Sequence, residues 1–415
     1  MNDRALGLLA KADLFFITSH HYGILGTNHR GGPPGFVRVL QNEPSTVVLV
    51  YPEYSGNRLY QTLGNLKVIP RAGLIIPDFD NGDALYLTCE TDILIGKEAT
   101  ALLPRSNMAV KLSLTGVRFV AGALAFRGHS SSPSPYNPSV RYLTSERKPH
   151  DAVGSGGELV SAKLMTKTIL TSTITRLGFK CENSELARSR KPGQYAVFNF
   201  ENELSLGYSH MRNDDPKSLN DDFIRSFTVS SPVVGSMARN QFEITIRNVG
   251  KATDLLFNQQ VRNHIEIPLK GFAGDFQMGS SGDGVLPFVA GGIGITPLLA
   301  HIPQIDLTNL RLFWTINAQD LGLVEDTFSS WPKLKPSTSL FITGIIDSLS
   351  SDYRHLLETT KAPGAEILTR RLTASDLTNH QSLSSTWYVC TGKPLRQSLL
   401  EWLKEKTVIY EDFDY

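Results

Sequence analysis

The chain has 415 residues, with 41 Lys and Arg residues against 40 Asp and Glu residues, for a net charge of +1. A near-neutral charge argues against nucleic acid and anionic membranes as partners, because both attract basic proteins. The length exceeds what one hydrophobic core usually supports, so we expect roughly two or three domains.

The cysteines and the apolar segments indicate the compartment. Cys89, Cys181 and Cys390 lie far apart, and no C-x-x-C spacing occurs. This pattern predicts neither a disulfide framework nor an iron–sulfur cluster. No segment of about 18 consecutive apolar residues occurs, and no apolar leader follows the first charges. We therefore expect a cytoplasmic protein with no membrane contact.

Residues 1 to 126 predict a small β barrel. Short β-type runs such as "VVLVYPEY", "AGLIIPDF" and "ALYLTCETDILIG" are separated by turn residues, and no long amphipathic helix is evident. Asn81-Gly82 predicts a hairpin, because both residues tolerate positive φ. His20, His21 and His29 lie close together, but no carboxylate or cysteine spacing supports a metal site, so we predict none.

Residues 127 to 157 are rich in Ser, Pro, Gly and charge, which predicts a linker. Residues 158 to 280 again contain β runs, among them "TKTILTSTITRLGF", "GQYAVFNFE", "IRSFTVSS" and "FEITIRNVG". They predict a central antiparallel β barrel.

Residues 281 to 415 change character. Short apolar strands ("VLPFVA", "LRLFWTI", "SLFITG", "TWYVCTG") alternate with helix-like segments, which predicts a C-terminal α/β domain with a parallel sheet. Pro303 follows Pro297 by six residues and should end the first helix early. The segment "PLRQSLLEWLKE" predicts a helix with an apolar face made by Leu395, Leu399, Leu400 and Leu403.

Two stretches carry candidate chemistry. In "RSFTVSSP", strand alternation places Arg225 and Phe227 on one face and Ser226 and Thr228 on the other. An arginine can hold a phosphate and an aromatic ring can cover a flat heterocycle, but a plain amphipathic strand is the alternative. In "FVAGGIGITPLLA", three glycines before a helix start favour either a phosphate cradle or an ordinary tight turn.

Seven motifs in order resemble the ferredoxin–NADP reductase superfamily. They are "KPGQY", "RSFTVSS", "NVGKATDLL", "GFAGDF", "AGGIGITP", "YVCTGKP" and "YEDFDY", spread over residues 160 to 415. The resemblance implies an FAD-binding barrel followed by an NAD(P)H-binding domain, with hydride passing from the nicotinamide to the flavin. It also favours the phosphate cradle for the glycine-rich stretch.

The resemblance implies roles for individual residues. Arg225 would contact the FAD diphosphate, Phe227 would pack on the flavin, and Thr228 would donate a hydrogen bond to flavin N5. Thr228, Cys390 and Glu411 would lie nearest to the chemistry. The other implied cofactor residues are Ser226 on the same strand, Gly250 and Thr253 at the diphosphate, Gly291, Gly292, Gly294 and Thr296 at the nucleotide phosphates, Gly392 by the nicotinamide, and Phe413 and Tyr415 beside the flavin.

The sequence departs from the superfamily in three places. Phe227 replaces a commoner tyrosine, the turn after Cys390 carries extra residues, and Pro303 shortens a helix of the nucleotide domain. The segments "FWTINAQD" and "FITGIIDS" offer no arginine for a 2′-phosphate, which favours NADH over NADPH. Three arginines elsewhere could still reach it, namely Arg311, Arg370 and Arg371.

The first domain has a resemblance of its own. "HRGGPPGFVRVL", "YPEYSGNRLYQTLGNL" and "PRAGLIIPDF" resemble the pyridoxamine-phosphate-oxidase-like split barrel, which often binds FMN at a dimer interface. Arg30, Asn57, Arg58 and Asn65 are the candidate FMN residues, because guanidinium and amide groups suit a phosphate and a ring edge. In the alternative, the glycines only shape turns and Arg58 lies in solvent.

The sequence as a whole predicts an NAD(P)H-dependent flavoprotein oxidoreductase with FAD and with NADH or NADPH as cofactors, and FMN is a further candidate cofactor. No ferredoxin-like segment follows, so we expect electrons to pass to a small molecule, to a second flavin or to a separate acceptor protein. A homodimer is possible. The alternatives are a diffusible flavin reductase, or a flavin-binding or dimerisation module whose nucleotide site is degenerate.

Overall fold

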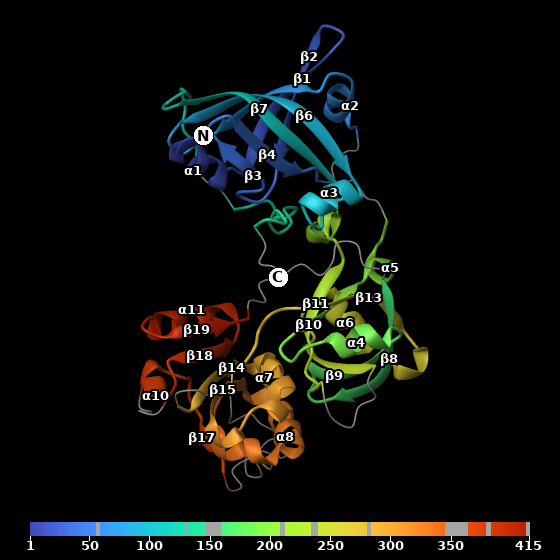
Figure 1. The fold of residues 1–415 in the computed structure, drawn as a ribbon, viewed down its shortest axis with the longest axis vertical. Helices are drawn as coiled ribbons and strands as arrows, with labels where there is room; N and C mark the ends of the chain where they lie inside the picture. The colour runs from blue at the N-terminus through green and yellow to red at the C-terminus, as the bar shows by residue number, and fades with distance from the viewer. Residues whose placement is uncertain are drawn as a thin grey trace. The chain divides into compact units, whose positions relative to one another are not determined.

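The computed structural model describes residues 1–54, 59–129, 132–146, 159–207, 212–233, 240–279, 284–344, 364–378 and 383–411. The chain forms two compact units (Figure 1). Unit 1 comprises Met1–Ser155 and Ser205–Phe223, and unit 2 comprises Gly156–Leu204 and Ile224–Tyr415. The predicted boundaries after residues 126, 157 and 280 stay predictions. Among the described residues, no helix combines the length and the hydropathy that crossing a membrane requires.

Unit 1 is built on a seven-stranded sheet in the order β2-β1-β5-β6-β7-β4-β3, with antiparallel neighbours throughout. Its elements are α1 (Asp3–Lys11), β1 (Leu14–His21), β2 (Ile24–Gly31), β3 (Arg38–Glu43), β4 (Thr46–Pro52), α2 (Gln61–Val68), β5 (Arg71–Pro77), β6 (Ala84–Ile95), α3 (Lys97–Leu102) and β7 (Met108–Val120). The predicted antiparallel strands are confirmed, whereas their closure into a small β barrel and the relationship to split barrels stay predictions.

Local chemistry explains the hairpin and the first helix of unit 1. Gly82 adopts a φ of +81° between β5 and β6, which confirms the hairpin predicted at Asn81-Gly82. Helix α1 was not predicted from the sequence. The Asn2 side chain accepts a hydrogen bond from the Ala5 amide and caps this helix, and Leu8 is buried against the sheet.

Residues 212 to 223 belong to unit 1 although they lie between two strands of unit 2 in the sequence. The Asp222 carboxylate pairs with Arg105 and lies 3.2 Å from the Arg141 guanidinium. The Tyr136 hydroxyl donates a hydrogen bond of 2.6 Å to the Asn213 side-chain oxygen. Arg141 is 7% exposed, and burial lowers the pKa of its guanidinium while Asp222 opposes that shift. The segment is therefore held on unit 1 by ion pairs rather than by strand pairing.

The first part of unit 2 is a six-stranded antiparallel sheet in the order β11-β10-β13-β8-β9-β12. A bridge between Val229 and Ile244 joins the two edges, so the sheet closes into the predicted central barrel. Its elements are β8 (Val160–Ile169), β9 (Ile174–Cys181), α4 (Ser184–Ser189), β10 (Tyr195–Asn199), α5 (Glu201–Leu204), β11 (Ile224–Thr228), β12 (Gln241–Arg247), α6 (Lys251–Asn258) and β13 (Glu266–Ala273).

The second part of unit 2 is a six-stranded parallel sheet in the order β17-β16-β15-β14-β18-β19, which confirms the predicted α/β domain. Its elements, orange to red in Figure 1, are β14 (Leu286–Gly291), α7 (Thr296–His301), β15 (Leu310–Asn317), α8 (Leu321–Ser330), β16 (Thr338–Thr343), β17 (Glu366–Leu368), α10 (Ala374–Thr378), β18 (Thr386–Cys390), α11 (Lys393–Trp402) and β19 (Thr407–Tyr410).

Helices cover both faces of the parallel sheet. Phe288 and Trp314 pack in one core with α7 and α8, whereas the adjacent residues Val289 and Phe313 pack in a second core with α10 and α11. The alternation explains why these strands are apolar throughout. Helix α7 ends at His301, and a short 3₁₀ helix over Ile302–Gln304 contains Pro303, which confirms the predicted early end.

The predicted apolar face of α11 is only partly buried. Leu399 is 0% exposed and Leu403 is 4% exposed. Leu400, which the sequence places on the same apolar face, is 36% exposed. A helix turns by about 100° per residue, so Leu400 lies at the side of the face that Leu399 defines.

The turn at Gly193 gives a stability prediction. Gly193 has a φ of +81°, and a Cβ there would lie 1.8 Å from the Phe276 carbonyl oxygen. Gly23 has nearly the same φ, +82°, with nothing within 4 Å of its Cβ position. We expect Gly23→Ala to cost about 1–2 kcal/mol of unfolding free energy from backbone strain alone. Gly193→Ala should cost about 1–3 kcal/mol more, because backbone must move to admit the methyl group.

Urea unfolding of both variants measures this difference. Equal losses for Gly193→Ala and Gly23→Ala would contradict the close approach of the Gly193 turn to Phe276.

Candidate functional site

A cavity of about 610 Å³ lies in unit 2 at the point where the strand order of the parallel sheet reverses. Strand β14 pairs with β15 on one side and with β18 on the other, and chain segments following the carboxyl ends of β14 and β18 line the cavity. Ligands of open parallel sheets bind at such a switch point. The lining residues are Arg225–Thr228, Thr245–Arg247, Val249–Thr253, Gly291–Gly294, Thr296 and Cys390–Gly392.

Strand β11 forms one wall of the cavity. Its residues Arg225, Ser226, Phe227 and Thr228 all belong to the lining, and Thr228 is the most buried of the four. The Phe227 ring packs at 6.1 Å from the ring of Phe198, centroid to centroid, in a tilted arrangement. This aromatic support fixes the Phe227 ring while leaving it at the cavity.

The start of α6 forms the adjoining part of this wall. The Thr253 hydroxyl accepts hydrogen bonds from the Val249 and Gly250 amides, both at 2.9 Å, and donates to the Gly250 carbonyl at 2.8 Å. Thr253 therefore holds the first turn of the helix in shape. Gly250 and Thr253 both line the cavity, together with Lys251.

Close packing explains why two of the three positions in the glycine-rich turn after β14 are glycines. A Cβ on Gly294 would lie 1.9 Å from the Cys390 carbonyl oxygen, and one on Gly291 would lie 3.1 Å from the Thr391 Cβ. These glycines let the ends of β14 and β18 approach each other closely.

Backbone conformation explains the third glycine, Gly292. Its φ is +56°, and its carbonyl accepts a 3.0 Å hydrogen bond from the Trp314 indole on β15. Helix α7 behind this turn has only six residues. The turn thus presents backbone to the cavity, and its shape is held by the neighbouring strands.

The end of β18 carries Cys390, which is 1% exposed. Burial raises the pKa of its thiol, and the Glu411 carboxylate raises it further. Glu411 is 9% exposed and follows β19 directly. The predicted residues Phe413 and Tyr415 lie outside the described residues.

The candidate FMN residues of unit 1 are engaged within the protein or lie outside the described part. Arg30 donates a hydrogen bond of 2.9 Å to the Glu53 carboxylate, and the Asn65 side chain donates one of 3.0 Å to the Ser19 hydroxyl. Burial raises the pKa of Glu53, and Arg30 opposes that shift. Asn57 and Arg58 are outside the described residues. FMN binding by this set stays a prediction.

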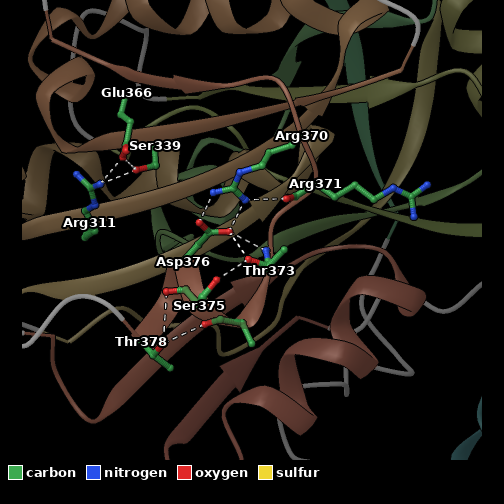
Figure 2. A network of polar contacts seen from close by, with 10 residues as sticks. Arg311, Ser339, Glu366, Arg370, Arg371, Thr373, Ser375, Asp376 and Thr378 are labelled. Atoms are coloured by element: carbon green, nitrogen blue, oxygen red, sulfur yellow. Dashed lines mark hydrogen bonds and ion pairs between the residues drawn. The ribbon is translucent and has the colours of Figure 1, made fainter.

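The three arginines considered for a 2′-phosphate lie in different places. Arg311 pairs with Pro287 near the amino ends of the strands and donates to Glu366 at 2.9 Å. Arg311 therefore lies at the amino ends of the strands, whereas the glycine turn follows their carboxyl ends. Figure 2 shows Arg370 held by Asp376, at 2.5 and 2.7 Å, while the Arg371 side chain points away from this pair.

Sequence reasoning missed two cations of the cavity, Arg247 and Lys251. Arg247 ends the predicted strand "FEITIRNVG", and alternation places it on the same face as Thr245, which also lines the cavity. The alternation could have indicated this position, but not that this face turns toward the glycine turn. That placement depends on how the barrel packs on the parallel sheet.

The histidines form no metal site in the described part of the chain, where no group of three or more His, Cys, Asp or Glu side chains could hold an ion. His20 accepts a hydrogen bond of 3.1 Å from the Gly23 amide at the β1–β2 turn.

No family model matches the chain, and no curated protein matches it. Several solved structures are similar at low identity. One is the flavohemoglobin of Malassezia yamatoensis with bound FAD and heme, at 16% identity and a TM-score of 0.40, covering 61% of this chain. This chain spans only 59% of that protein's length.

Two others align over nearly their whole length. The ferredoxin NADP+ reductase of Neisseria gonorrhoeae, with bound FAD and NADP, is 14% identical with a TM-score of 0.40, covering 62% of this chain and 99% of that one. The cytochrome b5 reductase domain of Ulva prolifera nitrate reductase is 16% identical with a TM-score of 0.41, covering 61% of this chain and 97% of that one. We argue the function of the cavity from its own residues.

The three buried thiols give a prediction about reactivity. All three cysteines are buried and free, and burial raises each thiol pKa, for Cys89 to about 12. A raised pKa keeps the thiol protonated below that pKa, and only the thiolate attacks. At pH 8 we expect no thiol of the native protein to react with an aromatic disulfide reagent. All three thiols should react once urea has unfolded the protein. Rapid reaction of one native thiol that Cys390→Ser abolishes would contradict the burial of Cys390.

Proposed function

We propose that the protein is an NAD(P)H-dependent flavoprotein oxidoreductase, with FAD on the barrel and the pyridine nucleotide at the glycine turn. One observation carries the proposal. The cavity opens at the strand-order reversal of the parallel sheet and is lined from the other side by β11, β12 and α6. Its volume of about 610 Å³ is within the range of small-molecule sites.

The barrel wall fits the chemistry of a flavin dinucleotide. Arg225 and Lys251 bring cationic groups to the lining, and a diphosphate needs such charge. The half-buried Phe227 ring offers an apolar face to a flat heterocycle, and the Thr228 hydroxyl is next to it in the lining. A flavin there would accept two electrons and a proton as hydride.

The opposite wall fits a pyridine nucleotide. Gly291, Gly292 and Gly294 present backbone without side chains, so an anionic diphosphate can approach closely. The turn Cys390–Gly392 borders the same cavity and would meet the nicotinamide. These residues hold the reactants next to each other and exclude water, and such positioning is the protein's main contribution to a hydride transfer.

The proposal for the electron acceptor names only its class. Electrons would leave to a small molecule or to a separate acceptor protein, and a second flavin on unit 1 is the further proposal. Flavin content distinguishes the last case, since FMN bound by unit 1 should fall in the double variant Asn57→Ala, Arg58→Ala while FAD stays. A wild-type preparation that contains FAD and no FMN would exclude electron transfer to a second flavin on unit 1.

The decisive measurement is anaerobic reduction of the purified protein. We expect a yellow protein with a flavin absorption band that bleaches on addition of NADH or NADPH, with NADH reacting faster. A yellow protein that neither nucleotide bleaches would be a flavin-binding module, and a colourless protein that cannot be reconstituted with FAD would contradict the proposal.

Arg225→Ala tests the flavin site itself. Loss of a charged hydrogen bond to a diphosphate costs about 1.5–3 kcal/mol, so FAD affinity should fall roughly 10- to 100-fold. Arg188→Ala is the matched control, because Arg188 is an exposed arginine on α4 of the same barrel outside the cavity lining. Fluorescence titration of the apoprotein with FAD measures both. Equal affinities for the two variants would refute the role of Arg225.

A further inference from the structure

The two walls of the cavity are joined by an ion pair whose carboxylate is buried. The Arg247 guanidinium, at the end of β12, lies 2.6 Å and 3.2 Å from the two carboxylate oxygens of Asp320. Asp320 ends the 3₁₀ helix that follows β15, and it is 2% exposed. The Thr173 hydroxyl bonds to the same carboxylate at 3.3 Å. The barrel and the parallel sheet therefore meet through a bidentate contact in which the carboxylate is buried and the arginine side chain is 31% exposed.

This ion pair lies at the cavity, close to the glycine turn. Arg247 is a lining residue, and its Nη2 atom is 3.4 Å from the position that a Cβ on Gly292 would take. The Gly292 carbonyl is held by Trp314 on β15, the strand that leads to Asp320. The pair thus joins β12 to the end of β15, and β15 in turn holds the glycine turn through Trp314.

A second ion pair joins the same two parts away from the cavity. Arg176 on β9 pairs with Asp326 on α8, with distances of 2.5 and 3.3 Å, and neither residue lines the cavity. Backbone contact adds to this docking, since a Cβ on Gly322 of α8 would lie 2.1 Å from the Leu170 carbonyl oxygen. General docking of the barrel on the sheet therefore has support that does not depend on Arg247.

We propose that the Arg247–Asp320 pair is a positioning clasp that sets the separation of the β11–β12 wall from the glycine turn. The inference rests on the proposed function for its consequence, which is the stacking of nicotinamide on flavin. A planar guanidinium held by both carboxylate oxygens has one favoured geometry, and burial of Asp320 makes loss of that geometry costly. Hydride transfer is sensitive to displacements of about 1 Å.

The test uses two double variants in the full chain. Arg247→Gln with Asp320→Asn removes both charges of the clasp and leaves no buried carboxylate alone. Arg176→Gln with Asp326→Asn removes both charges of the second pair and serves as the matched control. Urea unfolding of each checks that both double variants fold.

The first readout is hydrogen–deuterium exchange of the ligand-free protein, which needs no flavin. In the clasp variant we expect the segment over residues 288 to 300 to exchange about tenfold faster or more, because β15, whose Trp314 holds the Gly292 carbonyl, loses its link to β12. The control variant should match the wild type within about twofold over this segment. Equal exchange in the clasp variant and the wild type, or equal acceleration in both variants, would overturn the inference.

The second readout is flavin reduction at saturating NADH together with the long-wavelength charge-transfer absorption of the stacked rings. A displaced turn should slow reduction roughly 10- to 100-fold and weaken that band in the clasp variant only. Unchanged reduction with faster exchange would overturn the positioning role of the clasp. A wild-type protein that no nucleotide reduces would refute the proposed function, while the exchange result would still decide whether the clasp holds the turn.

Discussion

The close approach of the glycine turn to the end of β18 is the constraint on which the cavity depends. Only hydrogen fits between the Gly294 Cα and the Cys390 carbonyl, since a Cβ would come within 1.9 Å of that oxygen. Two parallel strands can therefore end side by side, and the chain segments after them can diverge around a shared space. Sheets whose strand order reverses open a crevice at this point, and the barrel closes its other side.

The contribution of an ion pair in unit 2 depends on how far its side chains are buried. The Arg370–Asp376 pair has an arginine side chain 47% exposed, and such pairs contribute little to stability in water. The Arg247–Asp320 pair has a carboxylate side chain only 3% exposed, so loss of Arg247 would leave a costly buried charge on Asp320. A pair of this kind fixes geometry more than it adds stability, which would suit the proposed stacking of nicotinamide on flavin.

Unit 1 contributes a different feature, the docking of residues 212 to 223 through Asp222. This segment leads directly into β11, whose residues Arg225 and Phe227 line the cavity. Phe223, the last residue of the segment, has a φ of +56°, a conformation that costs a residue other than glycine free energy. The sequence predicted none of this, because the segment reads as part of the second barrel.

The sequence by itself determined the order of the parts and most of the cavity lining. Alternating apolar runs predicted the antiparallel strands, the change of period after residue 280 predicted the parallel sheet, and Pro303 predicted the short α7, because these signals act within a few residues. From Arg225 to Gly392, the predicted residues of unit 2 lie together in one cavity.

Only the tertiary structure decided that Arg247 and Asp320 meet, that Gly294 packs on Cys390, and that Leu400 is exposed. These facts depend on the angle and separation at which barrel, sheet and helices pack, and those are set by the sum of many buried contacts distant in sequence. No short stretch of sequence encodes that sum.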